Sequence, residues 1–65
     1  MNPTDEALIE RATKAYFRRF GKHADFPSSH DCSVSARGVV RLACVRGELA
    51  RYQYDRKADR LSFVR

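Results

Sequence analysis

The chain has no tryptophan, only two cysteines, two prolines and three glycines, and no long apolar run. Without a run of about 18 apolar residues, there is no candidate for a membrane span. The acidic start, Met1 to Glu6, lacks the basic and apolar regions of a secretory signal peptide. We therefore expect a cytoplasmic protein with no membrane partner, whose two cysteines are buried thiols rather than a disulfide.

Size sets a second limit. At 65 residues the chain forms at most one domain, and such a domain buries only about 60% of the surface that its unfolded chain exposes. That core leaves no room for a deep substrate cavity. The run Ser28-Ser29-His30-Asp31 cannot act as a catalytic triad, because neighbours on one short loop do not converge. We expect a non-enzymatic protein without a cofactor or a small-molecule substrate.

Positive charge is distributed unevenly. Residues 1–31 carry five basic and five acidic side chains, whereas residues 32–65 carry eight basic and three acidic ones, which is the whole net charge of +5. Most of the basic residues are arginines, which bind phosphates and carboxylates bidentately and stack on aromatic planes. The excess indicates an anionic partner, or it serves only the solubility of a small domain.

Residues 5–20 have the pattern of an amphipathic helix. Apolar side chains recur there at spacings of three and four, at Leu8, Ile9, Ala12, Ala15, Tyr16 and Phe20. Thr4 or Asn2 can cap the start of this helix, and Gly21 suits the position after its end. Residues 21–31 follow as a connector, in which Pro27-Ser28-Ser29 favours a turn.

Two Arg-Gly pairs, at 37–38 and 46–47, divide residues 32–54 into three strand-length pieces. We predict three-residue loops at 36–38 and 45–47, each closed by a glycine in a left-handed conformation. The strands are then 32–36, 39–45, 48–54 and, after a polar turn, 60–64. This loop length places even-numbered residues on one apolar face and Arg51 and Gln53 on the other, whereas a two-residue loop would exchange the faces.

The predicted fold class is α+β, a single domain over residues 1–65 in which one N-terminal helix packs on one face of a four-stranded antiparallel β-meander. A single helix covers a single face, so the other face meets water or a partner. That face mixes arginines with apolar residues, which is typical of an interaction surface. The predicted partner contacts are Arg37, Arg41, Arg46, Arg51, Gln53, Lys57 and Arg60, with Val45 and Leu49 as apolar contacts. The alternative is a solvated sheet face with incidental aliphatic residues.

Three functions are open at this point. The first is a non-enzymatic module that binds nucleic acid, with Arg41 and Arg51 at the centre of the contact. The second is a protein-binding regulator or inhibitor, which uses the same face on an acidic protein surface, pairs through an edge strand, or forms a homodimer. The third is a small metal-binding domain with the ligands His23, His30, Cys32 and Cys44, although their spacing matches no common zinc finger.

One part of the chain resembles known proteins. The stretch Gly47-Glu48-Leu49-Ala50-Arg51-Tyr52-Gln53-Tyr54, followed by Asp59-Arg60-Leu61, resembles the hairpin of short uncharacterised bacterial proteins, some of which occur on mobile elements. The resemblance covers less than a third of the chain. It implies an accessory protein of a bacterium or phage, and it implies no catalytic residues.

Overall fold

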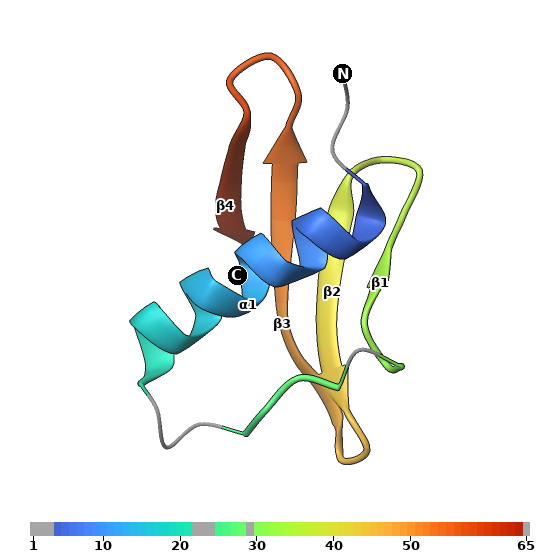
Figure 1. The fold of residues 1–65 in the computed structure, drawn as a ribbon, viewed down its shortest axis with the longest axis vertical. Coiled ribbons are helices and arrows are strands. Elements are labelled where there is room, and N and C mark those ends of the chain that lie inside the picture. The colour runs from blue at the N-terminus through green and yellow to red at the C-terminus, as the bar shows by residue number, and fades with distance from the viewer. Residues whose placement is uncertain (1–3, 22–24, 29, 65) are drawn as a thin grey trace.

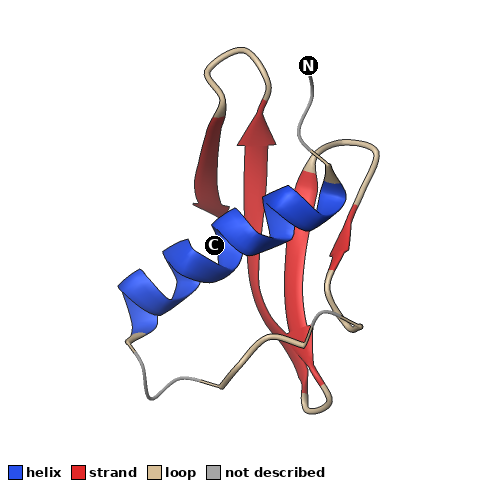
Figure 2. Ribbon diagram, viewed as in Figure 1, coloured by secondary structure: helices blue, strands red, loops and turns tan. Residues whose placement is uncertain are grey.

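One helix and one four-stranded sheet make up the computed structural model, which describes residues 4–21, 25–28 and 30–64 (Figure 1). Along the chain these are α1 (Asp5–Phe20), β1 (Ser33–Val34), β2 (Val39–Cys44), β3 (Gly47–Asp55) and β4 (Arg60–Val64). The strands are antiparallel and lie in chain order, β1-β2-β3-β4. The helix packs across one face of the sheet, mainly over β2 (Figure 2). The predicted fold class is confirmed.

The helix has the predicted bounds because both of its ends are capped locally. The Oγ1 of Thr4 accepts a hydrogen bond from the N–H of Ala7 at 3.1 Å, whereas Asn2, the alternative cap, lies outside the described residues. Two acidic residues, Asp5 and Glu6, occupy the first turn, where the helix dipole favours negative charge. After the last turn Gly21 adopts a φ of +88°, and its N–H donates to the carbonyl of Phe17 at 2.8 Å.

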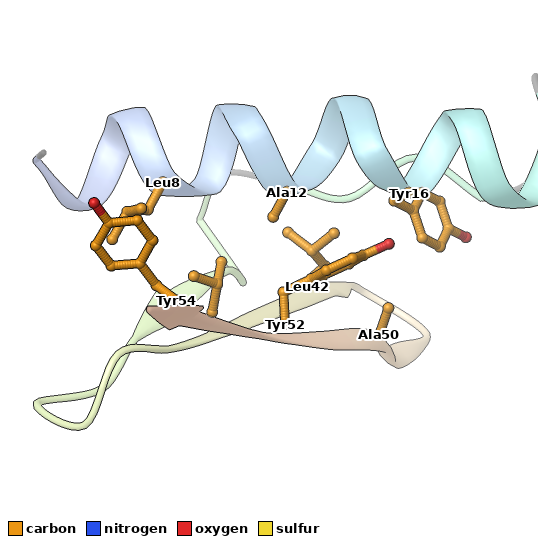
Figure 3. Close-up of a cluster of buried hydrophobic side chains, with 8 residues drawn as sticks. Leu8, Ala12, Tyr16, Leu42, Ala50, Tyr52 and Tyr54 are labelled. Atoms are coloured by element: carbon orange, nitrogen blue, oxygen red, sulfur yellow. The ribbon is translucent and has the colours of Figure 1, made fainter. Parts of the chain in front are cut away.

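The core lies between the apolar stripe of α1 and the sheet face beneath it, which we call the covered face. Leu8, Ala12 and Tyr16 of the helix meet Val40, Leu42, Ala50, Tyr52 and Tyr54 of the sheet. Figure 3 shows Leu42 below Ala12, with Tyr54 near the Leu8 end of the helix and Ala50 near the Tyr16 end. All sheet residues of this cluster are even-numbered, so the predicted parity of the strands is confirmed.

The β1–β2 hairpin has the predicted three-residue loop, 36–38. The N–H of Ser35 donates to the carbonyl of Val39 at 2.9 Å and closes the loop. Gly38 adopts a φ of +82°, and a Cβ at this position would lie 3.1 Å from the carbonyl oxygen of Tyr54. The strand β1, Ser33–Val34, is shorter than the predicted 32–36. Before it the N–H of Cys32 donates to the carbonyl of Ser28 at 3.0 Å, and after it the N–H of Gly38 donates to the carbonyl of Ser35 at 3.0 Å in the turn.

The β2–β3 hairpin corrects the prediction of a second three-residue loop. Cys44 pairs with Gly47, so the loop consists of Val45 and Arg46 alone, and the strands end at 44 and begin at 47 rather than at 45 and 48. A β-bulge restores the parity, because Leu42 pairs with Ala50 whereas Ala43 pairs with Glu48. Leu49 is the additional residue of this bulge.

The bulge decides which face Glu48 occupies. Cross-strand partners share a face of a sheet, so Glu48 lies with Ala43 on the side away from α1, which we call the outer face. The predicted three-residue loop would pair Glu48 with Cys44 and turn it toward the helix. The outer face contains Ser33, Val39, Arg41, Ala43, Glu48, Arg51, Gln53, Ser62 and Val64.

Candidate functional site

At the predicted centre of the outer face, two arginines share one carboxylate. Arg41 and Arg51 are cross-strand partners with half-exposed side chains. Two nitrogens of Arg51 donate to Glu48, the Nη2 at 3.2 Å, and the Nε of Arg41 lies 3.7 Å from the same carboxylate. The hydrogen bond from Arg51 lowers the pKa of Glu48, so this side chain is ionised at neutral pH. The trio therefore offers a partner one positive charge rather than two.

Of three other predicted contact residues, two have structural roles and the third is exposed in a loop. The Nε2 of Gln53 donates to the carbonyl of Arg37 at 2.8 Å and so supports the β1–β2 loop. Leu49, the bulge residue, is half-buried and packs against the core. Val45 is 93% exposed in the β2–β3 loop. The predicted apolar contact is thereby reduced to Val45.

The remaining predicted cations lie at the two ends of the sheet. At one end, the Nη1 of Arg46 is 3.7 Å from the Oδ1 of Asp25. At the other end lie the loop that joins β1 to β2 and the loop that joins β3 to β4 (Figure 1). These loops contain Arg37 and Lys57, and β4 begins there with Arg60. These three make no ion pair within the described residues. The predicted site thus divides into a compensated centre and a cationic end.

A second cationic surface, which the sequence patterns did not predict, lies between α1 and β4. It is a shallow groove of about 470 Å³, lined by Arg11, Lys14, Ala15, Arg18, Ala58, Asp59, Arg60 and Leu61. We call it the α1–β4 groove. Its three helical cations are spaced by three and four residues, which places them on one flank of a helix. That spacing, beside the apolar stripe, is the signal in the sequence that could have identified the groove.

Positive charge is in excess along this groove. Arg18 and Arg60 have no carboxylate within ion-pair distance among the described residues. Lys14 lies 3.5 Å from Glu10, but both side chains are about 70% exposed, so solvent screens this pair strongly. Asp59 is the one acidic residue that lines the groove. The groove can therefore accept an anion without first releasing a buried internal partner.

A clamp of three residues sets the geometry of the groove at its Asp59 end. The Oδ1 of Asp59 accepts hydrogen bonds from the Nη1 of Arg11 at 2.8 Å and from the hydroxyl of Tyr54 at 2.7 Å. The hydrogen bond from Arg11, followed by that from Tyr54, lowers the pKa of Asp59. The Nη2 of Arg11 also donates to the backbone carbonyl of Asp59 at 3.1 Å. These contacts tie α1 to the β3–β4 loop and so define the width of the groove.

The four predicted metal ligands are not assembled into a site by the described part of the chain. His23 lies outside the described residues, and His30 is exposed. Cys32 and Cys44 are free thiols, each half-buried rather than fully buried, and the Sγ of Cys32 lies 3.7 Å from the carbonyl oxygen of Ala43. Across the residues that the structure describes, no three His, Cys, Asp or Glu side chains are grouped so that they could hold a metal ion.

Comparisons of the chain with protein-family models, curated proteins and solved structures found no match. Within residues 4–21, 25–28 and 30–64, no helix has the length and apolar character needed to cross a bilayer.

Proposed function

We propose that this protein is a small non-enzymatic module that binds nucleic acid and holds phosphates in the α1–β4 groove. The observation that carries the proposal is the charge imbalance of the groove, whose charged lining residues are four basic side chains and one acidic side chain, that of Asp59. Arginine matches the geometry of phosphate oxygens bidentately. Neutralisation of phosphates supplies most of the affinity of sequence-independent binding to nucleic acid. Lys57, which precedes the lining residue Ala58 in the β3–β4 loop, adds a further cation beside the groove.

The outer face contributes less in this proposal than the sequence alone predicts. A phosphate that approaches Arg41 or Arg51 also approaches Glu48, whose carboxylate already accepts from Arg51. Binding there has to replace an existing ion pair. In the groove, Arg18 and Arg60 are solvated cations without such a competitor among the described residues.

The test is fluorescence anisotropy with labelled DNA and RNA at low and near-physiological salt. We expect Lys14→Ala/Arg18→Ala to weaken binding by about tenfold or more, and to reduce the slope of log K against log salt by about 1.5, because two phosphate contacts are lost. The matched control is Arg41→Ala/Arg51→Ala, which removes the same formal charge from the outer face. We expect a smaller loss for this control.

Two results would contradict the proposal. If neither nucleic acid binds the wild-type protein at near-physiological salt, the basic charge serves solubility. If the Arg41→Ala/Arg51→Ala variant loses more affinity than the groove variant, the contact lies on the outer face, as predicted from the sequence. Circular dichroism of each variant verifies that the fold is retained.

A second candidate function, binding of a protein partner, is favoured by an open strand edge. β4 pairs only with residues 51–55 of β3, so residues 47–50 have no neighbouring strand on that side within the described chain. Val64, 40% exposed, lies at the end of β4 beside this edge. An unpaired edge offers backbone N–H and C=O groups to an incoming strand.

Light scattering after size-exclusion chromatography tests the homodimeric form of this candidate. A dimer that Val64→Lys converts to a monomer would support pairing at the edge. A monomer at all concentrations would contradict the homodimer.

A further inference from the structure

The α1–β4 groove has cations on both of its walls. The helix wall contributes Lys14 and Arg18, and the strand wall contributes Arg60 at the start of β4. Arg18 and Arg60 have no carboxylate within ion-pair distance among the described residues. The pair of Lys14 with Glu10 is exposed and therefore screened by solvent. An anionic chain that lies in the groove is thus flanked by available positive charge on both sides.

The fold holds the two walls in a fixed relation. The guanidinium of Arg11 donates to the Oδ1 of Asp59 at 2.8 Å and to its backbone carbonyl at 3.1 Å, directly before Arg60 in the chain. The strand wall is held in turn by the pairing of Arg60 with Asp55 of β3. On the helix wall, the Cα atoms of Arg11 and Arg18 are about 10 Å apart along the axis. The groove therefore suits a polyanion whose charges are also fixed and closely spaced.

The uncharged part of the groove is aliphatic. Ala15, Ala58 and Leu61 line it, and within the described part of the chain no aromatic ring and no amide or hydroxyl side chain does so. Modules that bind single strands add aromatic rings on which bases stack, and amide side chains are among those that read base edges. The uncharged lining of this groove provides neither kind of contact, whereas its cations can contact phosphates.

We propose that the α1–β4 groove takes the sugar–phosphate backbone of duplex nucleic acid, without preference for base sequence. This inference rests on the proposed function and specifies its substrate class. In a duplex the backbone forms an outer ridge, and the base edges lie about 8.5 Å deep in the major groove. A concave protein surface receives that ridge, whereas a projecting element is needed to reach the base edges. Phosphate contacts position a protein on a duplex and carry no sequence information directly.

Charge density favours a duplex over a single strand. A duplex carries one negative charge per about 1.7 Å of its axis, and each neutralised phosphate contributes about −0.9 to the slope of log K against log salt, compared with about −0.7 for a single strand. If Lys14, Arg18 and Arg60 each contact one phosphate, we expect slopes of about −2.7 for the duplex and about −2.1 for the single strand. At about 50 mM salt the duplex should then bind about fivefold more tightly.

The experiment measures the anisotropy of a labelled oligonucleotide, as a duplex and as a single strand without self-complementarity, over a series of salt concentrations. It is carried out in both DNA and RNA form. A duplex rich in A·T or A·U pairs and a duplex of the same length rich in G·C pairs are also compared. We expect these two duplexes to bind within about twofold of each other, because the contacts are to phosphates.

Arg60→Ala tests the strand wall of the groove. The loss of one phosphate contact should weaken duplex binding about tenfold at about 50 mM salt and make the slope less steep by about 0.9. The matched control is Arg37→Ala, because Arg37 also makes no ion pair among the described residues but lies in the β1–β2 loop and does not line the groove. We expect this control to lose about twofold at most, from the lower net charge. Thermal unfolding of both variants verifies that the fold is intact.

The outcomes separate this inference from the proposed function. A single strand that binds as tightly as the duplex, or more tightly, would overturn the duplex inference while nucleic-acid binding stands. A difference of about tenfold or more between the two duplex sequences would overturn the backbone contact, because it requires readout of bases. An equal loss in Arg37→Ala would overturn the placement of the backbone between α1 and β4. Absence of binding to any form at near-physiological salt would instead overturn the proposed function.

Discussion

The covered and outer faces of the sheet are built from alternate residues of the same strands, yet different forces organise them. On the covered face Val40 and Leu42 are fully buried under α1. On the outer face Arg41 and Arg51, the intervening neighbours in the strands, remain half-exposed and share Glu48. The covered face contributes stability by removing apolar surface from water, whereas the outer face pairs its own charges.

The comparison shows that a count of arginines does not locate a binding site. The outer face contains Arg41 and Arg51, which the sequence predicts as the centre of the contact, but the carboxylate of Glu48 compensates part of their positive charge. The excess of positive charge lies instead at the border of the covered face, where α1 and β4 leave the α1–β4 groove. The position of a few carboxylates decides which cations are available.

The largest expected effect comes from the covered face. Leu42→Ala removes a fully buried side chain and should lower the free energy of unfolding by about 2 to 5 kcal/mol. That loss is comparable with the whole stability of a domain this small, so the variant should be largely unfolded at 37 °C. Denaturant unfolding followed by circular dichroism measures it. Arg41→Ala, one residue away on the outer face, should change the midpoint of denaturant unfolding little. Equal losses of unfolding free energy in the two variants would contradict the difference between the faces.

The next largest expected effect on stability comes from the β1–β2 loop, whose length determines which strand residues lie on the covered face and which on the outer face. Gly38→Ala should destabilise the protein by about 1 to 3 kcal/mol, because alanine is strained at a positive φ and its Cβ would meet the carbonyl of Tyr54. Gly21→Ala is the matched control, with a φ of +88° but no atom within 4 Å of the added Cβ. Thermal unfolding should show the smaller loss for Gly21→Ala. Equal losses would mean that the close approach at Gly38 is relieved by movement of the loop.

The clamp that attaches α1 over the covered face should give a pH-dependent effect. The pKa of Asp59 lies below its usual value of 3.8, mainly because Arg11 donates to it. Its contribution to stability is therefore present above that value and disappears as the pH falls through the lower pKa of the folded state. Asp59→Asn should lower the melting temperature at pH 7, and the difference from wild type should shrink below about pH 4. A difference that is constant from pH 7 to pH 2 would contradict the ionic role of Asp59.

Two substitutions that each replace a carboxylate by a neutral amide distinguish the outer face from the groove. Glu10→Gln releases Lys14 in the groove, and Glu48→Gln releases Arg41 and Arg51 on the outer face. Both add one positive unit, so non-specific attraction of nucleic acid rises equally. If the groove is the site, anisotropy at low salt should show an increase of about threefold for Glu10→Gln and a smaller one for Glu48→Gln. The reverse order would favour the outer face.

The smallest effect on stability is expected for Tyr52, whose hydroxyl lies on the covered face. This hydroxyl is buried, has no hydrogen-bond partner among the described residues, and its pKa is raised by burial. Tyr52→Phe should leave the stability unchanged or slightly higher, because removal of an unsatisfied polar group costs nothing. Tyr54→Phe should lower the stability, since it removes the hydrogen bond to Asp59. A clear loss in Tyr52→Phe would indicate that its hydroxyl has a partner in solution.

Much of the fold could be predicted because its signals are local. The bounds of α1 follow from the cap at Thr4, the apolar stripe and Gly21, and β4 has the predicted bounds of 60–64. The first Arg-Gly loop was predicted correctly, since the left-handed conformation of Gly38 is a property of a few neighbouring residues. The second was not, because two loop residues plus a bulge conserve the same parity as three loop residues.

The candidate site could be predicted only in part, because charge compensation depends on residues that are distant in the chain. Nothing near Arg46 in the sequence indicates its contact with Asp25, and the pairing of Arg11 with Asp59 spans most of the chain. The groove depends on the direction in which α1 crosses the sheet. Periodicity reveals which flank of the helix is cationic, but not which strand lies opposite that flank.

Composition alone establishes the excess of arginine. Local signals specify the α+β class, the helix and the alternation of the strands, because apolar periodicity and glycine positions act over a few residues. The tertiary structure decided that Glu48 compensates the centre of the outer face and that the helical cations face β4. Both outcomes depend on strand register and helix packing. These set distances between charges of a few ångströms, and at such distances one carboxylate determines whether an arginine is available to a partner.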